Sequence, residues 1–325
     1  MSSVEPAPIP PTRQGSLRWR VLRLSALLVG LGFLCWMLWT ILRNPAISLR
    51  AISPAGFAAA LVIGLAANAV IGVLFSRLIA KLAPSVSPRR RLASYYLSQL
   101  AKYIPGRIAA LLVQSATLNI PRSMTITLVT NVELMAISAW SCTMAAIACA
   151  TLLSNTALAI LAGVAGVLVT AWLIRIDWRP AMRLAWRIAG RTFDGESVEV
   201  CERPRFVQAL LLGMGSIILP AASMFVLLAY GFQYTSDHAL SLASALLLSW
   251  VGGTLAVVFP AGIGIRELLF IGIGHLIAPA PPAEQMAAIA LLSRLLQVLV
   301  DLLGVVAFAS VDFVRRYASG GQLAR

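Results

Sequence analysis

The sequence predicts an all-α membrane protein with about six full transmembrane helices and two broken, re-entrant helical hairpins in an inverted-repeat arrangement. First, 59% of its 325 residues are hydrophobic and 12% are charged, too few polar side chains to cover a soluble domain. Second, several apolar runs exceed the roughly 20 residues that span a bilayer, without the alternation of a β-barrel. Third, proline and glycine interrupt two of the longest runs near their centres.

The apolar segments cover most of the chain. They are residues 21–42, 54–80, 92–120, 124–153, 156–174, 206–230, 239–277 and 284–313. The first is too long for the apolar part of a signal peptide, so we expect it to be retained as a helix. The expected organisation is a disordered cytoplasmic tail (1–19), one transmembrane domain (20–315) and a short cytoplasmic tail (316–325).

Two short motifs break the long segments. "KYIPGR" (102–107) interrupts 92–120, and "FPAGIGIRE" (259–267) interrupts 239–277. Proline inside a helix removes a hydrogen bond and clashes with the preceding turn, and glycine adds backbone freedom. Each segment is therefore predicted to be helix–break–helix. The break positions are Pro105, Gly106, Pro260, Gly262 and Gly264.

The distribution of Arg and Lys orients the segments. Basic residues gather before residue 24, between residues 81 and 91, in the loop 175–205 and after residue 314, whereas 231–238 has none. The positive-inside rule then places both termini in the cytoplasm. This requires 92–120 to enter and leave on the cytoplasmic side and 239–277 to enter and leave on the outer side. Simple hydropathy would count seven or eight segments instead.

The order of elements repeats with opposite orientation. A span, a broken hairpin and a span make up residues 54–153, and the same order recurs over 206–313. Inverted repeats with broken helices near the membrane midplane are typical of transporters. Between them, the loop 175–205 carries Arg every four residues with Trp between, which fits an interfacial helix or an ordinary solvated loop helix.

Several classes of function are disfavoured. The net charge of +14 is what positive-inside loops produce, and no basic-aromatic nucleic-acid module accompanies it. The four cysteines and two histidines form no metal-binding spacing, and no HExxH protease motif occurs. The sequence therefore predicts no cofactor, no metal site and no catalytic residue.

The breaks carry charges that suit an anion. A helix that restarts after a break presents unpaired N–H groups and a positive dipole end. Arg266 stands at the second restart, and Lys102 and Arg107 flank the first break. Ionised residues at membrane depth are costly and usually functional, so these are predicted phosphate-binding residues. Glu267 is a further substrate-binding candidate and is expected to pair with a cation or to titrate.

The spans that follow the hairpins add polar groups. Arg294, Gln297 and Asp301 share one helix face, which is expected to look into the bundle. Arg294 is a further substrate-binding candidate, with Asp301, Glu267 or Glu133 as its partner. Candidates for ion or proton coupling are Glu133, Glu267 and Asp301. Weaker candidates are Asn68, Asn131, His275 and Arg77, the last expected to extend to the membrane interface.

The stretches "SQLAKYIPGR" (98–107) and "FPAGIGIRE" resemble the signature motifs of the lysylphosphatidylglycerol synthase transmembrane-region family. The resemblance covers about residues 20–315 and implies two re-entrant hairpins, lipid movement between leaflets and a bacterial inner-membrane location. It implies roles for the matching residues Lys102, Pro105, Gly106, Arg107, Pro260, Gly262, Gly264, Arg266 and Glu267. Synthases of the family carry a soluble transferase domain after the membrane part, which this sequence lacks, so it resembles the stand-alone members.

The predicted function is that of a flippase or scramblase for an anionic phospholipid or a polyprenyl-phosphate-linked sugar, not of an enzyme. The alternatives are an integral-membrane glycosyltransferase, a non-catalytic subunit of a cell-envelope pathway, or an ion or solute carrier. The short outer loops offer few carboxylates for a transferase base, which disfavours the first alternative. The expected partners are membrane lipids, with a second copy of the chain or a biosynthetic enzyme as protein partners.

Overall fold

The computed structural model describes Trp39 and residues 52–102, 108–120, 123–152, 156–175, 217–255, 265–275 and 281–318. Within these ranges the chain is helical apart from short turns, and they contain no strand, which confirms the predicted all-α class. The elements are α2 (Pro54–Leu82), α3 (Pro88–Ala101), α4 (Ile108–Leu118), α5 (Ser123–Leu152), α6 (Thr156–Arg175), a helix from residue 217 that ends in the π-helical turn η3 (Leu227–Gly231), α9 (Ser236–Leu255), α10 (Ile265–His275) and α11 (Ala283–Ala318).

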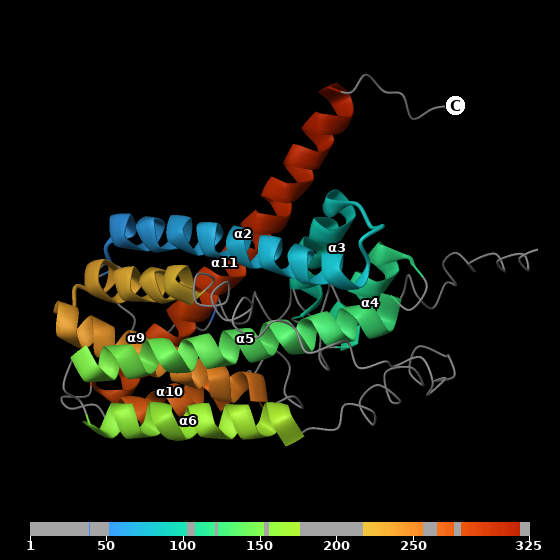
Figure 1. Ribbon diagram of the computed structural model, residues 1–325. Coiled ribbons are helices and arrows are strands. Elements are labelled where there is room, and N and C mark those ends of the chain that lie inside the picture. The colour runs from blue at the N-terminus through green and yellow to red at the C-terminus, as the bar shows by residue number, and fades with distance from the viewer. Residues whose placement is uncertain are drawn as a thin grey trace, which may run out of the picture.

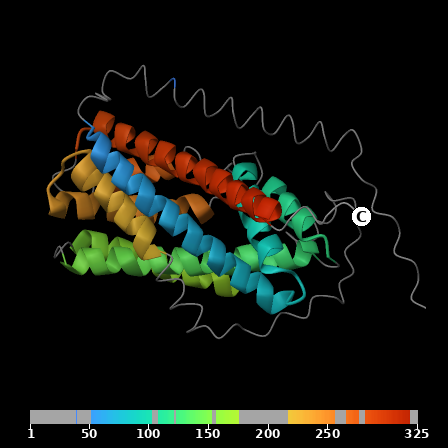
Figure 2. The ribbon, with the colours of Figure 1, turned by 90° about the horizontal axis from the view of Figure 1, so that it is seen from above.

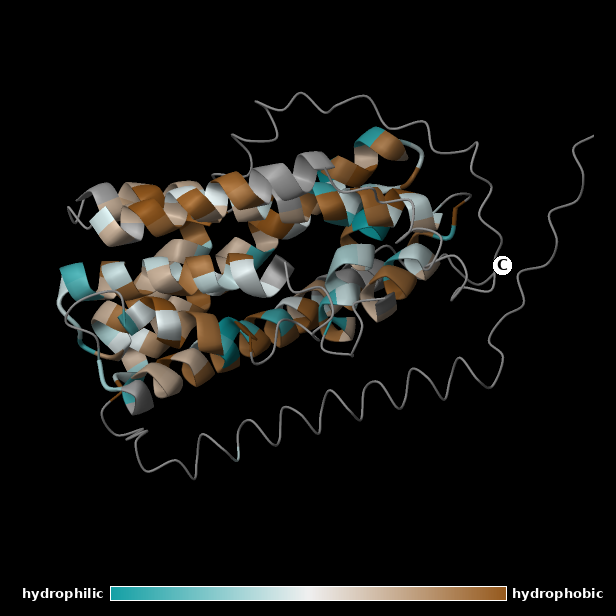
Figure 3. Cartoon of the chain, turned by 90° about the horizontal axis from the view of Figure 1, so that it is seen from below, coloured by the Kyte–Doolittle hydropathy of each residue, from teal (hydrophilic) through white to brown (hydrophobic). Residues whose placement is uncertain are grey.

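Three of these helices are long and apolar enough to cross a membrane, which supports the predicted membrane protein. They are α2, most of α5 (Ser123–Ala150) and the part Gln285–Ser310 of α11. Shorter apolar helices cover Ala109–Leu118, Ala159–Leu168 and Ile217–Gly231. Hydrophobic colours dominate the helices in Figure 3. The tail 1–19, the loop 176–205 and, apart from Trp39, the predicted segment 21–42 lie outside the described residues.

Serine followed by proline starts both α2 and α3. Ser53 Oγ accepts from Gly56 N at 3.2 Å, and Ser87 Oγ accepts from Arg90 N at 3.4 Å. Serine satisfies an unpaired N–H at a helix start, and proline fits the first helical position because its missing N–H is not needed there. As a result α3 begins at Pro88, four residues before the predicted 92. The arginines 89–91, expected in a loop, are therefore the first turn of α3.

The helices α3 and α4 form an antiparallel hairpin around the first break. Arg90 Nε donates to Thr117 O at 2.9 Å, and Ser94 Oγ donates to Gln114 O at 3.2 Å. Residues early in α3 thus lie beside residues late in α4, as a chain reversal requires. Figure 1 shows the two helices together at one end of the bundle. The prediction of a helix on each side of the "KYIPGR" break is confirmed.

The helices α9 and α10 form the corresponding pair around the second break. A Cβ on Gly253 would contact the Arg266 side chain, and one on Gly252 would meet Leu269. Position 252 precedes 253 while its neighbour 269 follows 266, so the two helices run antiparallel. This pair lies at the opposite end of the bundle from α3 and α4 (Figure 1). The break itself, residues 256–264, lies outside the described residues.

Contacts between helix ends locate the start of each hairpin. Ser53 N donates to Gly231 O at 2.9 Å, so the start of α2 lies at the end of η3. The second hairpin, beginning at Ser236, starts near this end of α2. The first hairpin follows the other end of α2 through the short turn 83–87. The two hairpins therefore enter the bundle from opposite ends of α2.

Helix α11 connects the two hairpins. It packs against α2, because a Cβ on Gly64 would contact Val300 and one on Gly304 would contact Asn68. Figure 1 shows α11 crossing α2, and Figure 2 shows the two helices from above. It also contacts α3 and α10. Small residues allow this close approach of helix backbones in membrane proteins. The largest buried cluster, which includes Leu242, Phe270 and Ile289, packs α9, α10 and α11 with α5 and α6.

Candidate functional site

One face of α11 carries the charged residues of the bundle interior. Arg294, Gln297 and Asp301 follow one another at intervals of three and four residues. Arg294 is 6% exposed and Asp301 is 4% exposed. Each of the three contacts a polar side chain of one of the two hairpins. The prediction that this face looks into the bundle is confirmed.

The second hairpin contacts this face through the first residues of α10. Arg294 Nε lies 2.7 Å from Glu267 Oε1 in an ion pair. Arg266 Nη1 donates to Gln297 Oε1 at 2.9 Å. Arg266 is buried, and it sits directly after the break that precedes α10. Of the partners considered for Arg294, Glu267 is therefore the correct one.

The first hairpin contacts the same face through the end of α3. Lys102 Nζ lies 2.7 Å from Asp301 Oδ2 and donates to Gln99 Oε1 at 3.0 Å. Asn68 Nδ2 of α2 lies 3.4 Å from the other oxygen of Asp301. Lys102 stands directly before the break that follows α3. Both hairpins therefore place a cation beside their break against α11.

These contacts lie deep in the bundle rather than at its ends. Asn68 is at the centre of the 29-residue helix α2. Lys102 follows the 14 residues of α3, which starts at the end of α2. Lys102 pairs with Asp301, whose other carboxylate oxygen lies 3.4 Å from Asn68 Nδ2. The ion pair between Lys102 and Asp301 thus forms at mid-length of a helix that is long enough to cross a membrane.

We call Lys102, Arg266, Glu267, Arg294 and Asp301 the α11 charge cluster. It combines three cations with two carboxylates, so its ionised side chains sum to one excess positive charge. Lysine and arginine are the side chains that bind phosphate in proteins, and arginine can bind it through two hydrogen bonds. A phosphate ester is therefore a ligand that suits the chemistry of these five residues.

A second polar chain links the first hairpin to α5. Gln114 Nε2 donates to Ser98 Oγ at 2.9 Å, and Asn131 Nδ2 donates to Gln114 Oε1. Asn131 also donates to Thr127 O at 2.7 Å. The sequence analysis included Asn131 but missed Gln114 and Ser98. An amide side chain within the mostly apolar stretch 108–118 was the available signal for Gln114.

The remaining predicted residues are not part of the cluster. Glu133 is half-buried on α5 and interacts electrostatically with Lys81, so its assignment as a partner of Arg294 is wrong. Asp301 is not the partner of Arg294 either, since the two lie two helical turns apart and Lys102 pairs with Asp301. His275 is exposed at the end of α10. Arg77 is exposed on α2.

Several predicted positions cannot be placed relative to the cluster. Arg107 and the break residues lie outside the described residues; the latter are Pro105, Gly106, Pro260, Gly262 and Gly264. Within the described part of the chain, no group of three His, Cys, Asp or Glu side chains could hold a metal ion. Comparison of the chain with family models, curated proteins and solved structures finds no match.

Proposed function

We propose that the protein carries an anionic lipid between the two leaflets of a membrane, with the lipid phosphate held by the α11 charge cluster. The excess positive charge of this cluster at mid-length of the bundle is the observation that carries the proposal. The acceptable substrates are an anionic phospholipid or a polyprenyl-phosphate-linked sugar, which share the phosphate that Lys102 and Arg266 would bind.

The proposed topology has two re-entrant hairpins related by an inverted repeat. In it, α3–α4 enters from the cytoplasmic side, α9–α10 enters from the outer side, and α11 crosses between them. The entry of the two hairpins from opposite ends of α2 supports this arrangement. Broken helices that meet near the midplane are the usual substrate site of inverted-repeat transporters. We place both termini in the cytoplasm and the protein in a bacterial inner membrane.

The two carboxylates of the cluster would act as internal substitutes for the lipid phosphate. Asp301 now neutralises Lys102 and Glu267 now neutralises Arg294. An arriving phosphate would compete with these carboxylates for the same cations. Protonation of Asp301 or Glu267 would release a cation to the lipid and offers a route for proton coupling. The sequence holds no nucleotide-binding GxxxxGK[ST] motif, so transport would be passive, ion-coupled or driven by consumption of the lipid.

If the lipid phosphate competes with Asp301 for Lys102, removing either residue of this ion pair should change lipid retention in opposite directions. Lys102→Gln removes a phosphate ligand and should reduce retention of the bound lipid about tenfold or more, as loss of one charge-assisted hydrogen bond implies. Asp301→Asn removes the competitor and should increase retention. Native mass spectrometry of the protein purified in mild detergent measures both, and vesicle reconstitution with a fluorescent derivative of the retained lipid measures transfer.

Lys81→Gln is the matched control. It removes the same charge as Lys102→Gln, but Lys81 is exposed and lies at the end of α2. It should leave lipid retention unchanged. If Lys102→Gln and Asp301→Asn lower the melting temperature alike and leave retention at the wild-type level, the pair is structural and the transport proposal fails.

A further inference from the structure

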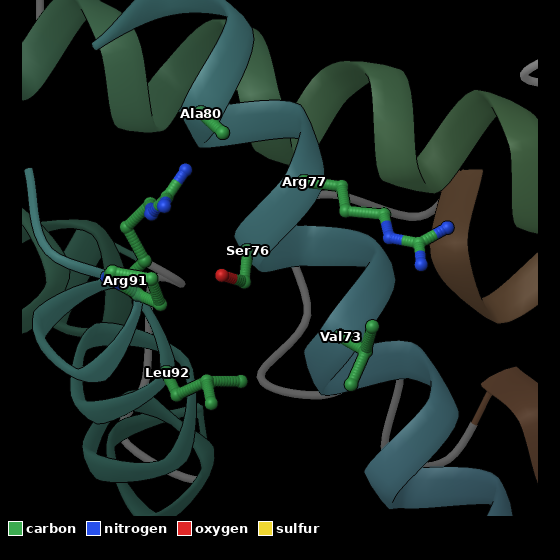
Figure 4. Close-up of a pocket in the computed structure, with 7 residues that line it drawn as sticks. Val73, Ser76, Arg77, Ala80, Arg91 and Leu92 are labelled. Carbon is green, nitrogen blue, oxygen red and sulfur yellow. The ribbon is translucent and has the colours of Figure 1, made fainter. Parts of the chain in front are cut away.

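A groove separates the end of α2 from the start of α3, away from the α11 charge cluster. It has a volume of about 330 Å³ and is lined by Val73, Ser76, Arg77, Ala80, Pro88, Arg91 and Leu92. This size is within the range of about 300–1,000 Å³ that is typical of small-molecule sites. Its lining combines an apolar wall with arginine and a hydroxyl, and Figure 4 shows these side chains.

The start of α3 carries an excess of positive charge that a bound anion would offset. The first turn of α3 carries arginine at residues 89, 90 and 91 and no acidic residue. The start of a helix is the positive end of its dipole, where acidic residues or anions stabilise and cations destabilise. The three arginines in the first turn of α3 add positive charge to the positive end of its dipole. A bound anion would offset both the dipole and the arginines.

Arg91 supplies a donor that the described part of the protein does not satisfy. Its Nε is fully buried and has no hydrogen-bond partner among the described residues. The Arg91 side chain extends from α3 alongside α2, and the Ser76 hydroxyl points from α2 toward α3 (Figure 4). Arg77 extends to the other side of α2 in the same view. A guanidinium N–H without an acceptor is costly, and Arg91 lines the groove, so a ligand oxygen there is the expected complement of its positive charge.

The surface that leads to the groove is apolar. Val62, Val70 and Val73 lie on one face of α2 and are 65%, 38% and 46% exposed. Arg77, which also lines the groove, continues this face toward the end of the helix. A long apolar strip that ends in a basic residue matches the shape of a phospholipid, whose acyl chains continue from an anionic headgroup. Free phosphate would make no use of this strip.

We propose that the α2–α3 groove is a binding site for the headgroup of an anionic phospholipid. The phosphate accepts from Arg91 and Ser76 at the start of α3, and an acyl chain lies along the valines of α2. The site stands apart from the substrate site of the proposed transport function. It holds whether or not the α11 charge cluster carries a lipid.

Native mass spectrometry of the full chain tests this with phosphatidylglycerol and phosphatidylcholine of identical acyl chains. Arg91→Gln should weaken binding of one phosphatidylglycerol about tenfold, the usual effect of losing a charge-assisted hydrogen bond. Ala80→Phe, which fills the groove without a change of charge, should have a similar effect. Neither variant should change binding of phosphatidylcholine. Lys81→Gln, with the same loss of charge outside the groove lining, should bind as the wild type does.

The same series separates this site from the α11 charge cluster. Arg91→Gln should remove one lipid in the wild-type and in the Lys102→Gln background alike. Wild-type binding by Arg91→Gln and Ala80→Phe with unchanged melting temperatures would overturn the groove site and leave the transport proposal intact. Displacement of phosphatidylglycerol by an equal concentration of inorganic phosphate would also overturn it, because the apolar strip would then contribute nothing. Loss of phosphatidylcholine together with phosphatidylglycerol would contradict the role of charge.

Discussion

Replacing Lys102 by methionine removes the ammonium group that pairs with the Asp301 carboxylate at 2.7 Å. The Asp301 side chain is 5% exposed and also lies 3.4 Å from the Asn68 amide, so the carboxylate would lose the Lys102 ammonium while staying buried. Removing one member of a buried ion pair costs about 3–5 kcal/mol. Asp301→Leu should cost less, about 1–3 kcal/mol, because the Lys102 side chain is 28% exposed, so its ammonium would be left less deeply buried than the Asp301 carboxylate.

The double variant Lys102→Met/Asp301→Leu should be more stable than Lys102→Met alone, since neither charge of this pair remains. Melting temperatures of the four proteins in one detergent measure this order. The expected order is wild type, then Asp301→Leu or the double variant, then Lys102→Met. If the double variant falls by the sum of the two single effects, the residues do not interact and the described ion pair does not stabilise the bundle.

Two further predictions test the packing. Gly56→Ala should lower the melting temperature by the equivalent of about 1–3 kcal/mol, because its Cβ would overlap the backbone of Tyr230 and Gly231. Gly163→Ala is the control, since a Cβ there meets no atom, and its higher helix propensity should leave stability equal or up to about 1 kcal/mol higher. Equal losses in both would refute the contact between α2 and η3. The buried thiol of Cys142 should react with a maleimide at least about tenfold more slowly than that of the half-buried Cys149, as peptide mapping by mass spectrometry can measure. Equal rates would show that the interior of the bundle at α5 is open.

The sequence predicted the elements of the fold because the apolar runs are long and their breaks are chemically distinct. Proline with glycine marks both hairpins, and helices α3, α4, α9 and α10 flank those breaks. The start of α3 was missed because hydropathy begins only after the arginines, whereas the Ser87–Pro88 pair starts the helix before them. The N-cap Ser87 determines where α3 begins, and a hydropathy average over a window of residues does not detect helix caps.

Within the site, the sequence predicted which face of α11 is used but could not choose partners. Spacing of three and four residues places Arg294 and Asp301 on one face whatever the tertiary structure. The choice of Glu267 over Glu133 depends on how α10 and α5 pack, which spacing does not encode. The sequence ranked Asn68 as a weaker candidate for the same reason. Its contact with Asp301 depends on the packing of α11 against α2, which the sequence of α2 does not reveal.

The proposed transport depends on α11 being shared by the two hairpins. On α11, Arg294 pairs with Glu267 of the second hairpin, and Asp301 pairs with Lys102 of the first hairpin. The two residues are separated by seven positions, which is about 10 Å along a helix. A lipid headgroup would therefore meet them at two different depths in the membrane. A phosphate that displaced Asp301 from Lys102 would leave a carboxylate on α11 in need of a cation, and Arg294 lies two helical turns away on the same face. Occupancy at one break would therefore alter the electrostatic balance at the other, which is the coupling that the proposed transport requires.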